Sequence, residues 1–321
     1  MSKLLELPPK EAFTRIMSGE AEAEDIKGFL LTLAERGESV EEIVAGAEIL
    51  RQKALKVDAP ENAIDSCGTG GDGQHTWNIS TAVGFVLAGC GAFVAKHGNR
   101  AVSSQSGSSD VLAALGVRLD MKPEEISHAI REVGIGFLFA PAHHSAMRHV
   151  APIRQELGRR TIFNLIGPLC NPADTKFQLM GVFDKKWLEP LAEALGRLGA
   201  KCAWVVHGED GLDELTITGK SFVAEWKDGK INCFEITPEQ AGLERAKPEA
   251  LRGGNVEENA KALRAILEGE KNAYRDIVIL NSAAGLYIIG KAKNIKEGAE
   301  LAQKSIDEGH ALHALEKLTT L

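Results

Sequence analysis

Asp65-Ser-Cys-Gly-Thr-Gly-Gly-Asp72 is the stretch that decides the fold, because a short apolar segment precedes it and the helical run Ile79-Ser-Thr-Ala-Val-Gly-Phe-Val-Leu87 follows it. Strand, glycine loop and helix in this order are typical of a loop that binds phosphate or pyrophosphate. A tight turn that needs positive φ explains the glycines equally well when this loop is considered alone. The spacing matches neither Walker A nor GxGxxG, which disfavours nucleotide hydrolysis and Rossmann cofactor binding.

Three more loops rich in glycine or polar side chains follow before residue 111: Asn78-Ile-Ser-Thr81, Lys96-His-Gly-Asn-Arg100 and Ser103-Ser-Gln-Ser-Gly-Ser-Ser-Asp110. Asn and Ser are good helix N-caps, so structural capping explains part of this pattern. Two cations, an imidazole and an amide at one strand end are seldom needed for folding, however, and five serines exceed what one cap can use. We therefore predict that the four loops form a cradle for a phosphorylated sugar.

The composition is that of a globular enzyme with few unusual features. The chain has 321 residues, enough for a large core, and a formal net charge of −8, so non-specific binding to nucleic acid or to an anionic membrane is not expected. No apolar run reaches the length of a membrane span, and the N-terminus becomes charged too soon for a secretory signal. Five cysteines without a CxxC motif disfavour a disulfide framework or a zinc site, and a reducing cytoplasm is the expected compartment.

The pattern of apolar residues divides the chain in two. Up to about residue 62 it predicts helices, with an apolar stripe from Ile26 to Leu33 and a capping box at Ser39 and Glu42. Beyond it, amphipathic helical stretches alternate with short β-prone runs at Phe93–Ala95, Ile135–Phe139, Ala203–Val206 and Ile277–Leu280. This alternation predicts an α/β fold with a mainly parallel central sheet flanked by helices, beside a small all-helical N-terminal domain.

Two further segments refine this organisation. Residues 222–226 and 230–234 flank Asp228-Gly229, a strong signal for a β-hairpin with a type I′ turn. Residues 157–172 are helix-like until Gly167-Pro168 and Asn171-Pro172 break them, and they could pass back to the small helical domain. We predict a helical domain at 1–63, with a contribution from about 157–173, and a catalytic α/β domain at 64–321.

Two charged positions outside the loops are candidates for ligand binding. Asp213 and Glu214 end the stretch His207-Gly-Glu-Asp-Gly-Leu-Asp-Glu214 after a predicted strand, and adjacent carboxylates suit Mg²⁺ held together with substrate phosphates. A merely solvated acidic loop is the alternative. Arg154 could pair with a carboxylate or form a surface salt bridge. His144 and Arg148 lie near it, but no HExxH motif indicates a zinc hydrolase.

In this order, the blocks resemble the anthranilate phosphoribosyltransferases of tryptophan biosynthesis, which belong with the nucleoside phosphorylase-like phosphoribosyltransferases. The resemblance runs over nearly the whole chain and is carried by CGTGGD, NIST, KHGNR, the serine run, RTIFNLIGPLxNP and HGxDGLDE. It implies that anthranilate attacks C1 of phosphoribosyl pyrophosphate (PRPP) to give N-(5-phosphoribosyl)anthranilate and pyrophosphate, with Mg²⁺ as cofactor. It also implies a homodimer that forms through the small helical domain.

The resemblance further implies which residues bind each ligand. PRPP would contact Gly68, Gly71, Asp72, Thr76, Asn78, Ile79, Ser80, Thr81, Lys96, His97, Gly98, Asn99, Arg100, Ala101, Val102, Ser103, Ser104 and Ser108. Anthranilate would contact Gly68, Asn99 and Arg154, with the arginine facing its carboxylate. Mg²⁺ would be held by Ser80, Asp213 and Glu214.

We expect catalysis by positioning and electrostatics, with Lys96 and Arg100 stabilising the departing pyrophosphate and no dedicated general base. A pyrimidine nucleoside phosphorylase is the closest alternative, because such enzymes have variants of the glycine and serine loops. A non-catalytic paralogue that binds nucleic acid is the other. That alternative predicts a basic face and an eroded acidic pair, whereas this chain is acidic and retains Asp213 and Glu214. Neither nucleic acid nor membrane is an expected partner.

Overall fold

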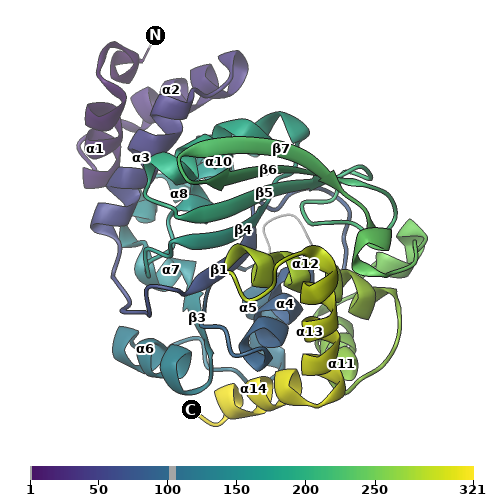
Figure 1. The fold of residues 1–321 in the computed structure, drawn as a ribbon. Coiled ribbons are helices and arrows are strands. Elements are labelled where there is room, and N and C mark those ends of the chain that lie inside the picture. The colour runs from purple at the N-terminus through teal and green to yellow at the C-terminus, as the bar shows by residue number, and fades with distance from the viewer. Residues whose placement is uncertain (1, 101–105) are drawn as a thin grey trace.

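A seven-stranded sheet forms the centre of the protein in the computed structural model, which describes residues 2–100 and 106–321 (Figure 1). The strands are β1 (Ile64–Gly68), β2 (Val94–Gly98), β3 (Ile135–Phe139), β4 (Phe177–Gly181), β5 (Cys202–Gly208), β6 (Ser221–Lys227) and β7 (Lys230–Ile236). Their order across the sheet is β3-β2-β1-β4-β5-β6-β7. Neighbours from β3 to β5 are parallel, and β6 and β7 are antiparallel, which confirms the predicted α/β class.

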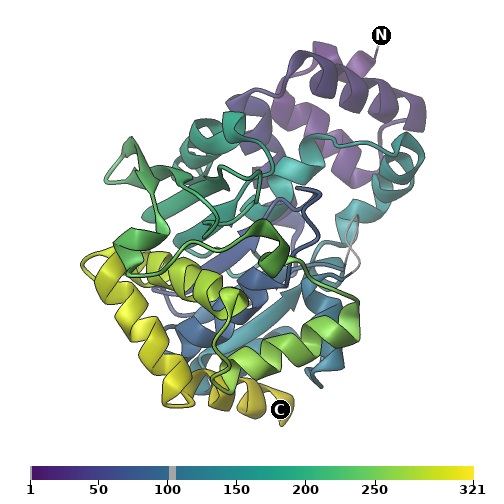
Figure 2. The ribbon, with the colours of Figure 1, turned by 90° about the vertical axis from the view of Figure 1, so that its right-hand side faces the viewer.

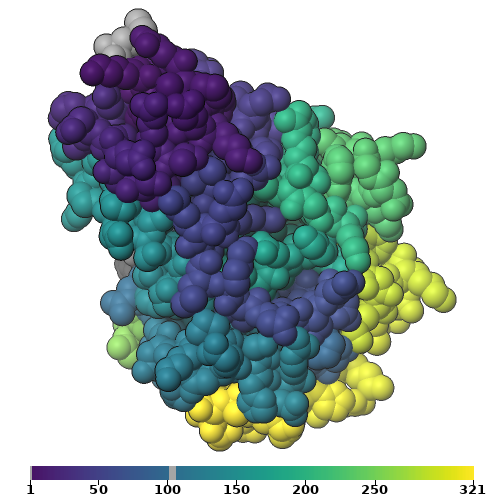
Figure 3. All heavy atoms as spheres, turned by 90° about the vertical axis from the view of Figure 1, so that its left-hand side faces the viewer, coloured from purple at the N-terminus to yellow at the C-terminus, as the bar shows by residue number. Residues whose placement is uncertain are grey.

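The N-terminal helices gather at one end of the molecule, as two side views show (Figures 2 and 3). They are η1 (Lys3–Glu6), α1 (Pro9–Ser18), α2 (Ala23–Arg36) and α3 (Val40–Lys53). The predicted capping box opens α3: Ser39 N–H donates to the Glu42 carboxylate at 2.9 Å, and Glu42 N–H donates to Ser39 Oγ at 3.3 Å. Burying the apolar stripe of α2 then stabilises the helices against each other.

Two helices from the middle of the chain join this end. They are α8 (Ala151–Leu157) and α9 (Ile162–Ile166), and η3 (Gly167–Leu169) follows them. Ile162, Phe163 and Ile166 belong to the same buried apolar cluster as Leu30 and Ile43 of the N-terminal helices. The chain therefore leaves the sheet after β3, packs on α1–α3 and returns to the sheet at β4.

The other helices cover the sheet and form the opposite end of the molecule. They are α4 (Ile79–Gly89), α5 (Ser108–Ala114), α6 (Pro123–Glu132), α7 (Ala140–His143), α10 (Leu188–Arg197), α11 (Val256–Leu267), α12 (Ala273–Ile288), α13 (Ile295–Asp307) and α14 (His310–Thr319). Short 3₁₀ turns are η2 (Ser145–His149), η4 (Lys185–Trp187), η5 (Pro238–Ala241) and η6 (Pro248–Leu251). α4 packs against the sheet on one side and α12–α14 on the other, so nearly all its side chains are buried.

Two strand predictions need correction. Ile277–Leu280 is not a strand but lies inside α12, where all four residues are fully buried. A short apolar run that is buried on every side has no periodicity to separate helix from strand. In addition, β2 continues to Gly98, so Lys96 and His97 lie within the sheet and not after it.

The predicted hairpin is confirmed. β6 and β7 pair from Ser221 with Ile236 to Lys227 with Lys230, and the turn residues Asp228 and Gly229 both have positive φ, +51° and +75°. These angles are those of a type I′ turn. The five cysteines are free thiols. None of the helices in the described part of the chain has the length and apolar character needed to cross a bilayer.

Candidate active site

The glycine loop after β1 lies directly against the predicted acidic pair. Gly70 N–H donates to the Asp213 carboxylate at 2.9 Å. A Cβ on Gly68 would lie 2.5 Å from Asp213 Oδ2, and a Cβ on Gly181 would lie only 1.5 Å from the Asp213 carbonyl oxygen. The ends of β1 and β4 therefore require glycine because the acidic loop rests on their backbones, at the carboxyl edge where parallel sheets bind ligands.

Three carboxylates crowd this edge. Asp213 N–H donates to the Asp72 carboxylate at 3.4 Å, and Glu214 is adjacent in sequence. Burial first, and the Asp72 charge second, raise the pKa of Asp213 to about 7. Burial and the neighbouring Asp213 raise the pKa of Glu214 well above its ordinary value. The hydrogen bond that Glu214 accepts from Ser80 N–H acts to lower this pKa. The three predicted metal ligands therefore lie together.

This donor set fits Mg²⁺ in the way that the ion is usually bound, by one or two carboxylates plus substrate oxygens and water. The charge of Lys96 offsets part of the negative charge at Glu214, but burial and the neighbouring carboxylates still raise the pKa values of Asp213 and Glu214, so a divalent ion would relieve the remaining repulsion. Within residues 2–100 and 106–321, no three acidic, histidine or cysteine side chains form a complete cage. Substrate oxygens would therefore have to complete the coordination.

The start of α4 lies against the serine loop. Thr81 Oγ1 donates to Ser108 Oγ at 3.1 Å. Asn78 occupies the N-cap position of α4, but its side chain does not cap the helix. The structural capping that the sequence suggested for this residue is therefore not observed. Its Oδ1 instead accepts hydrogen bonds from Ser106 Oγ at 3.2 Å and from Asn259 Nδ2 at 2.8 Å. Two of the predicted loops are thus joined by their own polar side chains.

Asn259, on α11, joins two of the loops by hydrogen bonds, and the sequence analysis missed it. It is 1% exposed, and its Nδ2 also lies 2.7 Å from Ser106 Oγ, so one amide connects both loops. An asparagine on the buried face of an amphipathic helix is the signal that could have identified it. The segment just before α11 also supports the glycine loop. Thr76 forms an isolated β-bridge with Arg252, and Gly253 N–H donates to the His75 carbonyl at 2.9 Å.

Lys96 is buried beneath these loops. It is 1% exposed, and its Nζ donates to the Ser66 carbonyl at 2.6 Å and to Ser80 Oγ at 3.3 Å. Burial lowers the pKa of Lys96, and the carboxylate of Asp65 counteracts that shift. Its charge therefore lies one hydroxyl away from the cradle, instead of projecting into it as a mobile side chain.

His97 pairs with His144, which the sequence analysis noted without assigning a role. The two Nε2 atoms are 3.3 Å apart, so a single shared proton joins the rings. Burial lowers the pKa of both groups, to about 4 for His144. Both imidazoles are therefore neutral at pH 7, and their shared hydrogen bond couples their tautomers.

The rest of the Lys96–Arg100 segment points towards the serine loop. A Cβ on Gly98 would lie 3.3 Å from the Ser108 Cβ and 2.7 Å from the Phe137 ring, so only glycine fits. Arg100 is exposed, its guanidinium 5.8 Å from the ring centroid of Phe139, and its N–H donates to Asn99 Oδ1 at 2.7 Å. The predicted contacts Ala101, Val102, Ser103 and Ser104 lie outside the described residues.

Arg154 and Arg160 belong to the α8–α9 region; Arg160 contacts the glycine loop, whereas the contacts of Arg154 in the described part of the chain are with Phe163 and Asn164. Arg154 is partly buried, lies 5.7 Å from the Phe163 ring centroid and donates to Asn164 Oδ1 at 3.4 Å. Burial lowers its pKa, and its contacts in the described part of the chain are with an amide and a ring and not with a carboxylate, so a surface salt bridge is not what holds it. Arg160, which the sequence analysis missed, donates to the Gly71 carbonyl and stacks 4.1 Å from the Phe183 ring centroid.

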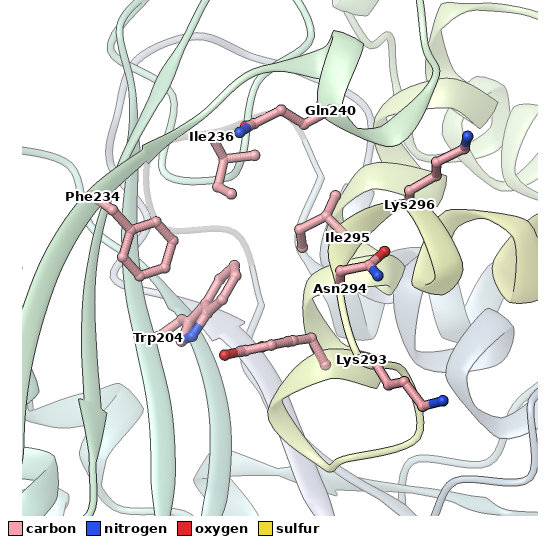
Figure 4. Close-up of a pocket in the computed structure, with 9 residues that line it drawn as sticks. Trp204, Phe234, Ile236, Gln240, Lys293, Asn294, Ile295 and Lys296 are labelled. Carbon is pink, nitrogen blue, oxygen red and sulfur yellow. The ribbon is translucent and has the colours of Figure 1, made fainter.

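A separate cavity of about 550 Å³ lies near the antiparallel edge of the sheet (Figure 4). Its lining is Trp204, Phe234, Ile236, Gln240, Tyr287, Lys293, Asn294, Ile295 and Lys296. None of these is a predicted site residue. The aromatic rings mainly contact each other, with Trp204 5.1 Å from the centroids of both Phe234 and Tyr287.

Comparison with known proteins identifies the family. The family model described as "Glycosyl transferase family, a/b domain" matches residues 60–312. An anthranilate phosphoribosyltransferase of Parvibaculum lavamentivorans is 59% identical over 309 residues, covering 96% of this chain and 91% of that protein.

Two solved structures share the whole fold. The anthranilate phosphoribosyltransferase of Thermus thermophilus has a TM-score of 0.93 at 46% identity, covering 97% of this chain and 94% of that one. The enzyme of Saccharomyces cerevisiae in complex with PRPP and Mg has a TM-score of 0.88 at 30% identity, covering 98% and 93%. The chain belongs to the anthranilate phosphoribosyltransferase family.

Proposed function

We propose that the protein transfers the 5-phosphoribosyl group of PRPP to the amine of anthranilate, giving N-(5-phosphoribosyl)anthranilate and pyrophosphate. This is the second step of tryptophan biosynthesis from chorismate. The observation that carries the proposal is the convergence of the polar loops with the Asp213–Glu214 loop at one edge of the sheet. Membership of the family gives the two substrates.

PRPP binds in this cradle through many backbone and hydroxyl donors. Among the residues that the structure describes, the proposed PRPP contacts are Gly68, Gly71, Asp72, Thr76, Asn78, Ile79, Ser80, Thr81, Lys96, His97, Gly98, Asn99, Arg100 and Ser108. Backbone N–H groups at the start of α4 carry partial positive charge that favours phosphate. Lys96, fixed on Ser80 Oγ, adds a full charge beneath them.

Ser80, Asp213 and Glu214 hold Mg²⁺ in this proposal. The ion supplies charge neutralisation for the diphosphate when it is bound. Gly70 N–H orients the Asp213 carboxylate, and Ser80 N–H orients that of Glu214. These contacts fix the carboxylates before substrate binds, so little reorganisation remains for the reaction.

Anthranilate binds beside Gly68 and Asn99 with its carboxylate facing Arg154, whose guanidinium has no carboxylate partner among the described residues. Its neutral amine attacks C1 while pyrophosphate departs, which leaves positive charge on the ribose and negative charge on the leaving group. Lys96 and Arg100 stabilise that negative charge. The amine needs no strong base, so positioning and electrostatics supply most of the catalysis.

Loss of anthranilate fluorescence on adding PRPP and Mg²⁺ to the purified protein tests this function. Fluorescence should fall only when both are present, and pyrophosphate should appear in equal amount. A parallel assay with thymidine or uridine and inorganic phosphate tests the phosphorylase alternative. Phosphorolysis of either nucleoside without anthranilate turnover would refute the proposed function.

The same proposal includes the organisation of the chain. Residues 1–63, with about 157–173, act as a small helical domain next to a catalytic domain at 64–321, and two copies associate through the helical one. The packing of α9 with α2 and α3 in one buried apolar cluster supports the contribution of 157–173 to the helical domain, and the same cluster continues onto β4, β5 and α10, where the two domains meet. Light scattering coupled to size-exclusion chromatography should give about twice the mass of one chain, which is 34.5 kDa. A mass of one chain at micromolar protein concentration would contradict the dimer.

A further inference from the structure

The sheet opens between β1 and β2, next to the proposed site. Each other parallel pair of neighbouring strands is in register over five residues, whereas β1 and β2 pair only at Ile64 and Val94. The bond from Ile64 N–H to the Phe93 carbonyl, 2.9 Å long, shows the register in which the ladder starts. The strands then diverge towards their carboxyl ends, which are the ends that carry the polar loops.

A regular ladder would continue with Ser66 opposite Lys96. In that register, His97 N–H would donate to the Ser66 carbonyl, and Ser66 N–H would donate to the Ala95 carbonyl. Side chains take these places instead. Lys96 Nζ donates to the Ser66 carbonyl at 2.6 Å, and His97 N–H donates to Asp65 Oδ1 at 3.1 Å.

The third backbone group is satisfied by a residue from a distant segment. Asn171 Nδ2 donates to the Ala95 carbonyl at 2.8 Å and to Asp65 Oδ2 at 2.8 Å. Asn171 itself is fixed, because its Oδ1 accepts the Ala173 N–H at 2.8 Å. Asp65, Lys96 and Asn171 thus form a polar wedge, which replaces the backbone ladder with side-chain hydrogen bonds.

The wedge is buried and depends on its charges. Asp65 is 0% exposed, and both Lys96 and Asn171 are 1% exposed. Each buried polar group in such a site needs its partner, since an unmatched one costs the full desolvation penalty. Burial raises the pKa of Asp65, and the charge of Lys96 counteracts that shift. Each charge therefore favours the charged form of the other.

We propose that Asp65 and Asn171 are positioning residues for PRPP binding, which hold β1 and β2 apart so that Lys96 reaches Ser80 beneath the cradle and the backbone at His97 is fixed beside it. This inference rests on the proposed function for its ligand. Asp65 fixes the backbone at His97 and balances the charge of Lys96, while Asn171 fixes the backbone at Ala95. Neither needs to contact substrate.

The test is Asp65→Asn, which keeps the shape of the side chain but removes its charge and turns a donor towards Asn171 or His97. The KM for PRPP and the calorimetric Kd for PRPP with Mg²⁺ should both rise at least about tenfold, as expected for the loss of a buried charge-assisted hydrogen bond. The KM for anthranilate should rise less than the KM for PRPP, because Lys96 and His97, which the wedge positions directly, are assigned to PRPP alone, whereas Gly68 and Asn99 are shared by both ligands. A loss of fold alone would not separate the two substrates in this way.

Glu225→Gln is the matched control. Glu225 is also buried, 8% exposed, and accepts a hydrogen bond from Trp204 Nε1 at 2.9 Å, but it lies on β6. This control should leave both substrate constants unchanged. If Asp65→Asn does not fold, the milder Asn171→Ser decides in its place by the same criteria.

The inference would be overturned if the folded variant, Asp65→Asn or Asn171→Ser, had a KM and a Kd for PRPP within about threefold of wild type. An equal rise in the KM for PRPP and the KM for anthranilate would overturn it as well. The calorimetric measurement needs no turnover. Wild-type protein that binds PRPP but does not consume anthranilate would therefore refute the proposed reaction and still test the wedge. Wild-type protein that does not bind PRPP would overturn both.

Discussion

β5, β6 and β7 pair residue by residue, with seven pairs on each side of β6, whereas β1 and β2 share only the pair of Ile64 and Val94. The hairpin edge is regular because alternation of its side chains and a two-residue turn fix its register locally. The β1–β2 region is irregular because side chains from several segments replace its ladder. In this sheet, the irregular region is the one that carries the polar loops.

The two regions also use glycine differently. Gly229 in the hairpin turn has positive φ and open space around the position of a Cβ. Gly181 at the end of β4 has no such φ, but the Asp213 carbonyl lies where its Cβ would be. Gly229 is required by its own backbone angle. Gly181 is required because a loop thirty-two residues further along the chain packs against it.

The largest expected effect comes from Gly181→Ala. The methyl group must displace the Asp213 backbone, since 1.5 Å is less than any non-bonded contact allows. A shift of about 1 Å in a positioned group can lower activity by on the order of 100-fold, and we expect such a loss in kcat/KM. Steady-state kinetics, with a melting curve to confirm folding, measure it.

Gly229→Ala is its control at the hairpin edge. It should cost roughly 1 kcal/mol of unfolding free energy, because alanine disfavours positive φ, and leave kcat/KM unchanged. If Gly181→Ala retained wild-type kinetics, the tight packing of Asp213 on β4 would have no catalytic importance, and the contrast between the two glycines would disappear.

The next largest effect is expected for Asp213→Asn combined with Glu214→Gln. Removing both charges weakens Mg²⁺ binding while keeping side-chain shape, so kcat/KM at fixed Mg²⁺ should fall at least about tenfold. Raising the Mg²⁺ concentration should recover part of the loss. Wild-type turnover in this double variant would refute the metal assignment.

Arg154→Ala should act on one substrate. The loss of a charge-assisted contact to the anthranilate carboxylate should raise the anthranilate KM about tenfold, and the KM for PRPP should change much less. Initial rates with each substrate varied in turn separate the two constants. Equal changes in both would contradict the carboxylate role, because a general loosening of the helical region would affect both ligands.

The smallest effect concerns acid stability. The pKa of His144 is about 4 in the folded protein and near 6.5 when unfolded, so its contribution to stability is present above pH 6.5 and is lost as the pH falls towards 4. Between pH 6.5 and 5.5 the free energy of unfolding should fall by about 1 kcal/mol for this group. Burial lowers the pKa of His97 as well, which adds to the loss in the same direction.

Urea denaturation at these two pH values measures it as a difference between proteins, because the raised pKa of Asp213 acts in the opposite direction in both: His144→Gln should lose less stability, or gain more, than wild type. His128→Gln, at an exposed position of α6, is the matched control. A wild-type acid sensitivity in His144→Gln would show that the buried histidine pair does not set this pH dependence.

Local patterns were sufficient for much of the architecture. The capping box at Ser39, the hairpin turn at Asp228 and the glycine loop after β1 each depend on a few adjacent residues, so all three could be predicted. The prediction failed at Ile277–Leu280, where complete burial in α12 removed the periodic signal. The motifs also identified Ser80, Asp213 and Glu214, which the structure brings together.

The sequence by itself determined which loops carry glycine, hydroxyl groups and charge, because those properties belong to single residues and their immediate neighbours. Only the tertiary structure decided that Asn259 connects two of the loops and that Asn171 inserts beside Asp65. Contacts between residues more than a hundred positions apart arise from the packing of helices on the sheet. A local pattern can mark Asn259 as a polar residue on a buried helix face, but it does not encode the partners of Asn259 or of Asn171, which is compatible with an ordinary turn.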